Sequence, residues 1–220
     1  MDKYLSIITN FGCHHTCPYC IVKNNNLHIP KTTLDGLREL PKAIAEHKPN
    51  WISISGGGDP LFNIENNMDW YDEMLWRATP INIKTEMHTS YIELNEKAAE
   101  VCSLMDRVVY HVRDVKDISK VKKYDDDQEQ ITRVVFVVTE DFTPEKIDKI
   151  VAEVKRCGID ELSFRQMVDD KYETTHYCEE YLKAGHKKDW YYIEQNDYNL
   201  YYCENEVSYR YKDFERVREE

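Results

Sequence analysis

Six short apolar runs rich in β-branched residues alternate with helical patterns, and this alternation limits the possible folds more than any other feature. The segments between the runs predict helices at Thr33–His47, Ile64–Ala78, Leu94–Met105 and Pro144–Cys157, and more weakly at Asp117–Tyr124. The runs predict strands at Tyr4–Asn10, Trp51–Gly57, Ile81–Met87, Arg107–Arg113, Thr132–Thr139 and Glu161–Met167. Successive strand–helix units imply parallel strands joined by right-handed crossovers. We therefore expect an α/β protein, and sandwiches and helical bundles are excluded.

The number of units leaves two architectures open. Six strand–helix units fit an open doubly wound sheet or a barrel, complete or partial, but fall short of the eight units of a full barrel. A chain of 220 residues is long enough for one well-buried core. We expect one main domain over residues 1–168, followed by a smaller C-terminal segment over residues 169–220.

The C-terminal segment differs in composition, because residues 170–220 hold ten of the sixteen tyrosines. Tyr172–Gly185 predicts a short helix that ends at its glycine. The stretch Asp189–Tyr211 predicts two or three antiparallel strands, with turns near Asn196–Asp197 and Glu204–Asn205. Such a segment covers a sheet edge, forms a dimer surface or caps a substrate pocket. A dimer is therefore left open.

The charge and the N-terminus bear on location and partners. The formal net charge is −12, with 41 acidic against 29 basic residues, which counts against a nucleic acid polymer as the main partner. No apolar run approaches the roughly 18 residues of a membrane span. The N-terminal residues lack the apolar region of a signal peptide and begin as a strand. We expect a cytoplasmic protein with no membrane association.

Polar residues follow the predicted strands, where parallel α/β folds collect their functional groups. Three cysteines follow the first strand and "SGGGDP" follows the second. Glu86 is expected to end the third strand, His111 the fourth and Arg165 the sixth. Since the carboxyl ends of parallel strands meet at one edge, these groups predict a functional site there.

The stretch "FGCHHTCPYC" places Cys13, Cys17 and Cys20 within eight residues. In a reducing compartment this clustering, within an odd total of seven cysteines, favours metal ligation over disulfides. A structural zinc site or a ferredoxin cluster needs a fourth ligand. His14 or His15 would strain to complete a tetrahedron from so short a loop. Three thiolates on a cubane cluster leave one iron open to another ligand.

The spacing Cys-x-x-x-Cys-x-x-Cys, with an aromatic residue before the last cysteine, resembles the signature of the radical S-adenosylmethionine superfamily. "ISISGGGDPL", Ile52–Leu61, resembles the glycine-rich motif of that superfamily. The resemblance covers roughly residues 4–167. It implies a partial (β/α)6 TIM-like barrel, here followed by a small tyrosine-rich C-terminal extension.

The resemblance also implies cofactors and ligand contacts. Cys13, Cys17 and Cys20 would hold a [4Fe–4S] cluster whose open iron chelates S-adenosyl-L-methionine. The backbone of Tyr19 would meet the adenine. Gly56, Gly57 and Gly58 would let main chain approach the methionine amino group, from which Asp59 would accept a hydrogen bond. Three glycines precede the acid where two are common, and Asp replaces the commoner Glu, so which peptide faces the ligand stays open.

Glu86, His111 and Arg165 are further candidate cofactor contacts. Their alternatives are a solvated rim carboxylate, a hydrogen-bonded core histidine and a structural ion pair, respectively. No catalytic residue is assigned. The activity implied by the resemblance is reductive cleavage of S-adenosylmethionine to a 5′-deoxyadenosyl radical that abstracts hydrogen from a substrate. An external electron donor of the flavodoxin or ferredoxin type would be the partner.

The remaining cysteines do not form a second group, so one cluster is expected. The small size is similar to that of glycyl-radical activating enzymes, including that of anaerobic ribonucleotide reductase, and of 7-carboxy-7-deazaguanine synthases. Two hypotheses follow: an enzyme that acts on a small molecule or nucleoside, and an enzyme that modifies a peptide or protein. A non-enzymatic iron–sulfur or zinc module is the third.

Overall fold

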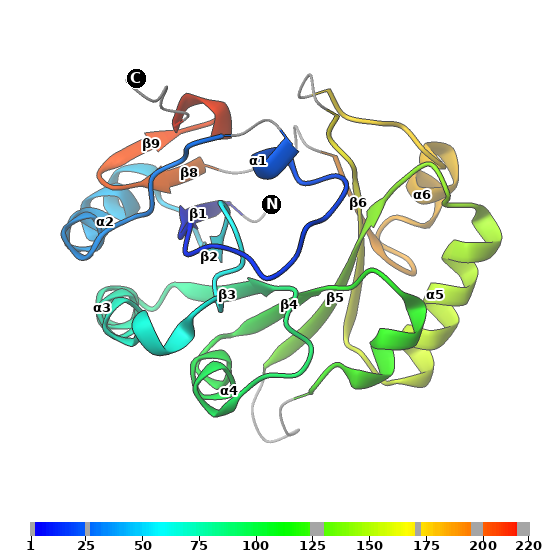
Figure 1. The fold of residues 1–220 in the computed structure, drawn as a ribbon, viewed down its shortest axis with the longest axis horizontal. Coiled ribbons are helices and arrows are strands. Elements are labelled where there is room, and N and C mark those ends of the chain that lie inside the picture. The colour runs from blue at the N-terminus through cyan, green and yellow to red at the C-terminus, as the bar shows by residue number, and fades with distance from the viewer. Residues whose placement is uncertain (1–2, 25–26, 124–129, 170–172, 195–199, 215–220) are drawn as a thin grey trace.

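The computed structural model of the chain describes residues 3–24, 27–123, 130–169, 173–194 and 200–214. Within them the strands form one sheet in the order β7-β6-β5-β4-β3-β2-β1-β8-β9, which curves into an arc (Figure 1). The strands are β1 Tyr4–Ile8, β2 Trp51–Ser55, β3 Lys84–Thr89, β4 Arg107–His111, β5 Ile131–Val138, β6 Glu161–Gln166, β7 Tyr191–Ile193, β8 Leu200–Cys203 and β9 Glu206–Ser208.

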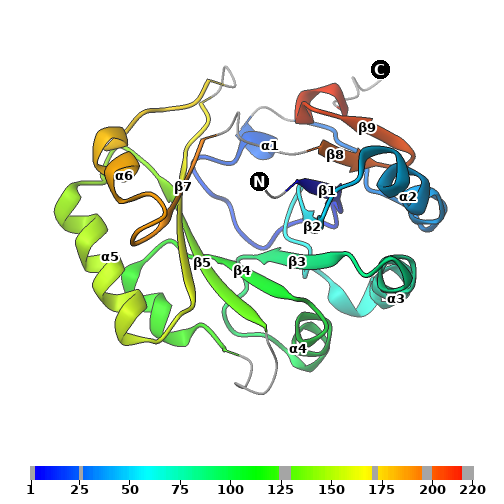
Figure 2. The same ribbon diagram turned by 180° about the vertical axis from the view of Figure 1, so that it is seen from behind.

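The first six strands pair in parallel and in sequence order, as the strand–helix alternation predicts. The α-helices are α1 Ile21–Asn24, α2 Leu34–His47, α3 Met68–Ala78, α4 Glu96–Ser103, α5 Pro144–Arg156 and α6 Glu179–Gly185. Short 3-10 turns are η1 Ile64–Asn66, η2 Thr79–Ile81, η3 Val115–Lys120 and η5 Tyr211–Phe214. Helices α2 to α6 lie outside the arc of the sheet (Figures 1 and 2). The chain thus folds as a partial TIM-like α/β barrel.

Local signals set the ends of the helices. Thr33 accepts a hydrogen bond from Gly36 N and caps α2, while Thr143 caps α5 in the same way, with Pro144 at its first position. The predicted third strand begins three residues late, at Lys84. The chain first makes the η2 turn, and Asn82 then takes a left-handed conformation with φ 54°.

The face of the sheet that meets the helices is apolar. Fully buried side chains such as Leu5, Ile52 and Phe164 pack there with Leu37, Met74 and Ile150 of the helices in one continuous core. Because successive strand residues point to opposite faces, the alternate residues point into the arc. On β3, β4 and β6 most of these inner residues are polar or charged, with Val109 of β4 as an apolar exception; the polar ones include Glu86, His88, Arg107, His111, Glu161, Ser163 and Arg165. Barrel interiors are usually filled by branched apolar residues, so this inner face is built for polar contacts.

The C-terminal segment joins both edges of the same sheet. β7 pairs with β6 and β8 pairs with β1, both in parallel, and only β8–β9 is the expected antiparallel pair. The expectation of antiparallel strands is therefore confirmed for β8 and β9 and wrong for β7, and the parallel pairing of β8 with β1 was not predicted. Period-2 alternation shows which residues share a face, but not which strand is the partner. The turn at 204–205 is confirmed, and the one near 196–197 lies outside the described residues.

The β8–β9 hairpin is anchored to the segment that follows the cysteines. Tyr202 is fully buried, and its hydroxyl donates to Gly36 O at 2.6 Å. The Thr33 hydroxyl donates to Glu204 at 2.8 Å. On the inner face a second buried cluster joins Ile8, Leu27 and Ile29 to Cys203 and Phe214. The tail therefore holds the inner wall in place beside the cysteine loop.

None of the helices in the described ranges is long and apolar enough to span a membrane.

Replacing Tyr202 tests the anchoring of the tail. Tyr202→Ala should lower the free energy of unfolding by about 3–5 kcal/mol, the usual cost of truncating a large buried aromatic side chain. Tyr202→Phe should cost about 1 kcal/mol, because it removes only the hydrogen bond to Gly36. Tyr209, 74% exposed, is the control, and Tyr209→Ala should change stability by about 0.5 kcal/mol or less. Urea denaturation measures all three, and equal effects of the two alanine variants would contradict this packing.

Candidate functional site

The cysteine loop connects β1 to α1 at the carboxyl end of β1. Cys13, Cys17 and Cys20 are free and half-buried. Cys17 O accepts a hydrogen bond from Cys20 N at 3.1 Å, which closes a turn. Cys13 Sγ accepts from His15 N at 3.4 Å, and Cys20 Sγ accepts from Lys23 N at 3.5 Å. Backbone N–H groups directed at sulfur suit thiolate ligands, whose charge they stabilise.

The donor chemistry of the loop bears on which metal centre it could hold. Among the described residues, no group of three or more His, Cys, Asp or Glu side chains is arranged to hold a metal ion. Thiolates are soft ligands that suit iron–sulfur clusters and zinc. A [4Fe–4S] cluster takes one thiolate on each of three irons and leaves the fourth iron to another ligand, so three cysteines on one loop are a chemically fitting donor set for it.

Tyr19 stands in the turn between the second and third cysteines. Burial, and then the neighbouring Cys17, raise the pKa of the Tyr19 hydroxyl to about 12. Burial also raises the pKa of the Cys13 thiol. The loop is thus partly shielded from water before any ligand is considered.

The glycine-rich loop packs directly against the cysteine loop. Gly12 O accepts from Asp59 N at 2.7 Å, and Gly56 O accepts from Asn10 N at 3.2 Å. A Cβ on Gly57 would lie 2.6 Å from Asn10 Cβ, and one on Gly58 would lie 2.1 Å from Gly12 O. Gly57 also has a φ of +75°, which favours glycine. These two glycines let the two loops touch.

Asp59 is 3% exposed, and its carboxylate is saturated by this protein's own donors. Oδ1 accepts from Leu61 N at 3.0 Å and from the Thr89 hydroxyl at 2.9 Å. Oδ2 accepts from the backbone N and from the hydroxyl of Ser90, both at 2.6 Å. A carboxylate has about four acceptor positions, and all are used. The structure therefore gives Asp59 the role of tying the loop after β2 to the end of β3.

Alanine substitutions at two glycines distinguish the effect of the contact between the two loops from the effect of backbone strain. Gly57→Ala and Gly158→Ala both place a side chain at positive φ, +75° and +64°, but nothing lies within 4 Å of the Gly158 position. We expect Gly57→Ala to displace the cysteine loop and to make its thiols react severalfold faster with a disulfide reagent in the metal-free protein. Gly158→Ala should leave those rates unchanged. Equal rates in the two variants would mean that the close approach at Gly57 does not hold the loop.

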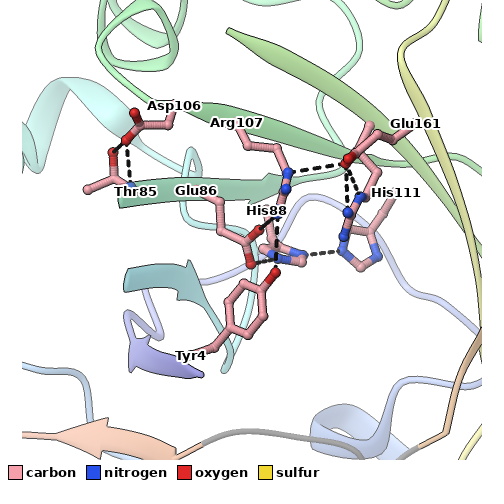
Figure 3. Close-up of polar contacts among 9 residues, drawn as sticks. Tyr4, Thr85, Glu86, His88, Asp106, Arg107, His111 and Glu161 are labelled. Atoms are coloured by element: carbon pink, nitrogen blue, oxygen red, sulfur yellow. Dashed lines mark hydrogen bonds and ion pairs between the residues drawn. The ribbon is translucent and has the colours of Figure 1, made fainter. Parts of the chain in front are cut away.

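A chain of ion pairs and hydrogen bonds crosses the inner face, as Figure 3 shows. Glu86 Oε2 lies 3.0 Å from Arg107 NH1, and Arg107 Nε lies 3.2 Å from Glu161 Oε2. Arg133 NH2 is 2.6 Å from the same Glu161 oxygen. The Arg107 guanidinium also stacks on the Trp51 ring, 4.1 Å from its centroid. Charges this deeply buried are tolerated because each has a partner.

Two histidines extend this chain toward the rim. His88 Nε2 is 2.9 Å from Glu86 Oε1, and His88 Nδ1 is 3.0 Å from His111 Nε2. The sequence predicts that Glu86 ends the third strand, and this prediction is wrong. Glu86 lies in the middle of β3 and is 3% exposed. The predicted strand begins three residues before β3 and ends two residues before it, so the prediction puts the carboxyl end of the strand too early in the chain.

Sequence reasoning placed His88 at the end of the third strand but missed Arg107, Arg133 and Glu161. The available signal was the charged residues at every second position of strands otherwise made of Val, Ile and Phe. Such spacing indicates one polar face, but only the curvature of the sheet brings β3, β4 and β6 close enough to pair their side chains.

The charge state of Glu86 follows from its partners. Burial by itself raises the pKa of the carboxyl, but His88, Arg107 and Arg133 outweigh it and hold the pKa at about 2. Glu86 is therefore ionised at neutral pH. Burial, and then His88 and Arg165, lower the pKa of His111 well below the ordinary value of a histidine, so His111 is neutral.

The low pKa of Glu86 predicts acid-dependent stability. A carboxyl with a pKa of about 4.3 in the unfolded chain and about 2 in the fold contributes about 3 kcal/mol above pH 4.3, and loses it as the pH falls toward 2. Glu86→Gln should therefore be about 3 kcal/mol less stable than the wild type at pH 7, and this gap should narrow at pH 3. Urea denaturation at both pH values measures it. A gap that is constant with pH would show that Glu86 does not titrate with a lowered pKa.

A cavity of about 260 Å³ opens at the rim between the cysteine loop and the ends of β3 and β4. His111 lines it, together with His14, His15, Tyr91 and Arg113. His14 and Tyr91 pack ring to ring at 3.7 Å, and Arg113 NH2 lies 2.9 Å from His15 Nδ1. The cavity therefore joins the predicted cofactor loop to the polar inner face.

The structure brings together most of the predicted site residues but not all of them. The three cysteines, Tyr19, the glycine run 56–58 and Asp59 lie in two touching loops. His111 lies on the cavity wall, and Arg165 lies on the inner face of β6, close enough to His111 to influence its pKa. Glu86 reaches this group only through His88.

Comparison with known proteins identifies a shared fold. No protein-family model and no curated protein matches the sequence. Streptococcus suis SuiB superimposes with a TM-score of 0.57 at 14% identity, covering 89% of this chain and 50% of SuiB. SuiB bound to its precursor peptide SuiA gives a TM-score of 0.57 at 15% identity, covering 89% and 49%. BtrN in complex with AdoMet and 2-DOIA gives a TM-score of 0.46 at 17% identity, covering 65% of this chain and 60% of BtrN, which is too low a score to establish a shared fold.

At these identities the likeness to SuiB establishes the fold alone. The chain spans about half the length of SuiB, so the activity of that whole protein does not follow from the superposition.

Proposed function

We propose that the protein is a radical S-adenosylmethionine enzyme. The observation that carries the proposal is the contact of two loops at the carboxyl ends of β1 and β2 in a partial barrel. One loop presents three half-buried cysteines, and the other is the glycine run 56–58 held against it by the Asp59 N to Gly12 O hydrogen bond of 2.7 Å. The barrel fold shared with SuiB supports the same architecture.

Each loop has a distinct role in this proposal. Cys13, Cys17 and Cys20 would hold a [4Fe–4S] cluster, with the N–H groups of His15 and Lys23 stabilising thiolate charge. The backbone around Tyr19 and the glycine run would contact S-adenosylmethionine. When bound, these cofactors supply one electron and a 5′-deoxyadenosyl radical able to take a hydrogen atom from a carbon.

The structure changes the role that we propose for Asp59. Its oxygens accept four hydrogen bonds from Leu61, Thr89 and Ser90, so it positions the loop rather than the methionine ammonium. The ammonium would instead meet backbone carbonyl oxygens of the loop. An external flavodoxin or ferredoxin would reduce the cluster from the exposed side, where His14 and Thr16 lie.

Two substrate classes remain in the proposal. A small polar molecule is favoured by the rim cavity of about 260 Å³, which matches a compact ligand. A peptide is the second candidate, because SuiB shares the barrel fold and has been solved with its precursor peptide SuiA. In that case a single side chain would enter the cavity.

Cluster content and cofactor cleavage test the proposal directly. Anaerobically reconstituted protein should bind about four irons and four sulfides per chain and, with dithionite, release 5′-deoxyadenosine from S-adenosylmethionine. Replacing Cys13, Cys17 and Cys20 by Ala should abolish both. The matched control is Cys157→Ala with Cys178→Ala, two half-buried cysteines outside the loop, which should keep both. One zinc per chain, or iron retained in the triple variant, would contradict the proposal.

A further inference from the structure

Glu86, His88 and His111 form a continuous hydrogen-bonded series on the inner face. Glu86 and His88 lie two residues apart on β3, so both point into the arc, and His111 ends the neighbouring strand β4. The contacts run from Glu86 Oε1 to His88 Nε2 at 2.9 Å, and from His88 Nδ1 to His111 Nε2 at 3.0 Å. Figure 3 shows the series leading away from the ion pairs of Arg107.

The series fixes which ring nitrogen carries each proton. Ionised Glu86 only accepts hydrogen bonds, so His88 Nε2 carries a proton and donates it. His88 Nδ1 lies 3.0 Å from His111 Nε2, and with the His88 proton on Nε2 this nitrogen accepts from His111 Nε2. Neutral His111 therefore carries its proton on Nε2 and has a lone pair on Nδ1. This nitrogen is not used by the series and is the one available to a molecule in the cavity that His111 lines.

The charges around His111 favour this state. From β3 it faces His88 and, one step further, Glu86, and from β6 it faces Arg165; the cavity is also lined by Arg113, His14, His15 and Lys120 and by the carboxylates of Glu93 and Asp117. Burial, His88 and Arg165 lower the pKa of His111, so a lasting positive charge on its ring is disfavoured. A proton taken up at His111 is better held on His88, beside the carboxylate of Glu86.

We propose that His111 accepts a proton at Nδ1 from a hydroxyl or ammonium group of the molecule that occupies the rim cavity. Glu86 and His88 are positioning residues that fix its tautomer and hold the transferred charge. That this molecule is the substrate rests on the proposed function; the relay itself does not.

The proton transfer balances without an oxidant. The O–H or N–H bond of the ligand breaks, its electron pair stays on oxygen or nitrogen, and a bond forms from the proton to His111 Nδ1. The proton on His111 Nε2 passes to His88 Nδ1. His111 ends neutral in its other tautomer, and His88 becomes an imidazolium paired with Glu86. A buried ion pair replaces what would have been an isolated buried charge.

Nitrogen-15 NMR of histidine-labelled, cluster-reconstituted full-length protein tests the relay. At pH 7 both His88 and His111 should carry their proton on Nε2. The amide of Glu86→Gln can donate as well as accept, so this variant should release the constraint on His88 Nε2, and a second His111 tautomer with its proton on Nδ1 should appear. His176, whose side chain is 63% exposed, is the internal control and should not respond. A proton on His111 Nδ1 in the wild type at pH 7, or an unchanged His111 tautomer in Glu86→Gln, would overturn the relay.

A second variant covers the case in which Glu86→Gln does not fold. In His88→Gln the amide oxygen accepts from His111 and the amide nitrogen donates to Glu86, so the neutral chain of hydrogen bonds is preserved. In this variant His111 should keep its proton on Nε2, but it can no longer transfer that proton, because the amide at position 88 cannot take it up. If His111 changes tautomer in this variant, its state is not set through position 88, and the assignment fails.

Small probes test the contact with a ligand. 1,2-Ethanediol and N-acetylserinamide should shift the His111 Nδ1 signal, whereas the matched 1,2-dimethoxyethane and N-acetylalaninamide, which lack the hydroxyl donor, should not. A response to the diol alone indicates a free small molecule, and a response to the serine amide indicates a peptide side chain.

If S-adenosylhomocysteine shifts the His111 Nδ1 signal instead, His111 contacts the cofactor and the proposed substrate contact is overturned. The absence of a shift with every probe would also overturn it. These outcomes are independent of cluster content and 5′-deoxyadenosine release, which test the proposed function.

Discussion

Asp59 ties together the loops that follow the first three strands, and the rest of the site depends on this connection. Its backbone N–H binds Gly12 of the cysteine loop, and its carboxylate binds Thr89 and Ser90 at the end of β3. The carboxylate is almost fully buried, so it is retained there only because every acceptor position has a donor. Together with the Arg113–His15 contact and the packing of His14 on Tyr91, it fixes the cysteine loop relative to the rim cavity.

The two faces of the sheet differ in their role, because the outer face packs against the helices and the inner face carries the polar side chains. The outer face and the helices form an apolar core, in which polar atoms such as the Tyr202 and Tyr71 hydroxyls donate to backbone carbonyl oxygens. The inner face carries Glu86, Arg107 and Glu161, whose desolvation is offset by mutual pairing. A row of paired charges leads by way of His88 to His111 at the cavity. The polar contacts of the interior are therefore continuous from the amino-terminal end of the sheet to its rim.

The tyrosine-rich tail contributes to the sheet itself. β7 and β8 pair with the two edge strands of the six-stranded core, satisfying backbone groups that an open barrel leaves unpaired. Through Tyr202 and Glu204 it also fixes the start of α2, and through Cys203 and Phe214 it packs beside the chain that follows Cys20. It therefore supports the cysteine loop through the segment that follows it, by both hydrogen bonds and apolar packing.

The sequence by itself determined the six parallel strands, the helices between them and the two loops of the site. These features depend on periodicity, caps and the spacing of Cys13, Cys17 and Cys20, all of which are local. Tertiary structure alone decided that Asp59 is saturated by Ser90 and Thr89, that Glu86 meets Arg107 and His88, and that the tail divides between the two edges. Those contacts join residues that are near in space but mostly far apart in the chain. Strand register and sheet curvature bring them together, and neither is encoded in the pattern of any single segment.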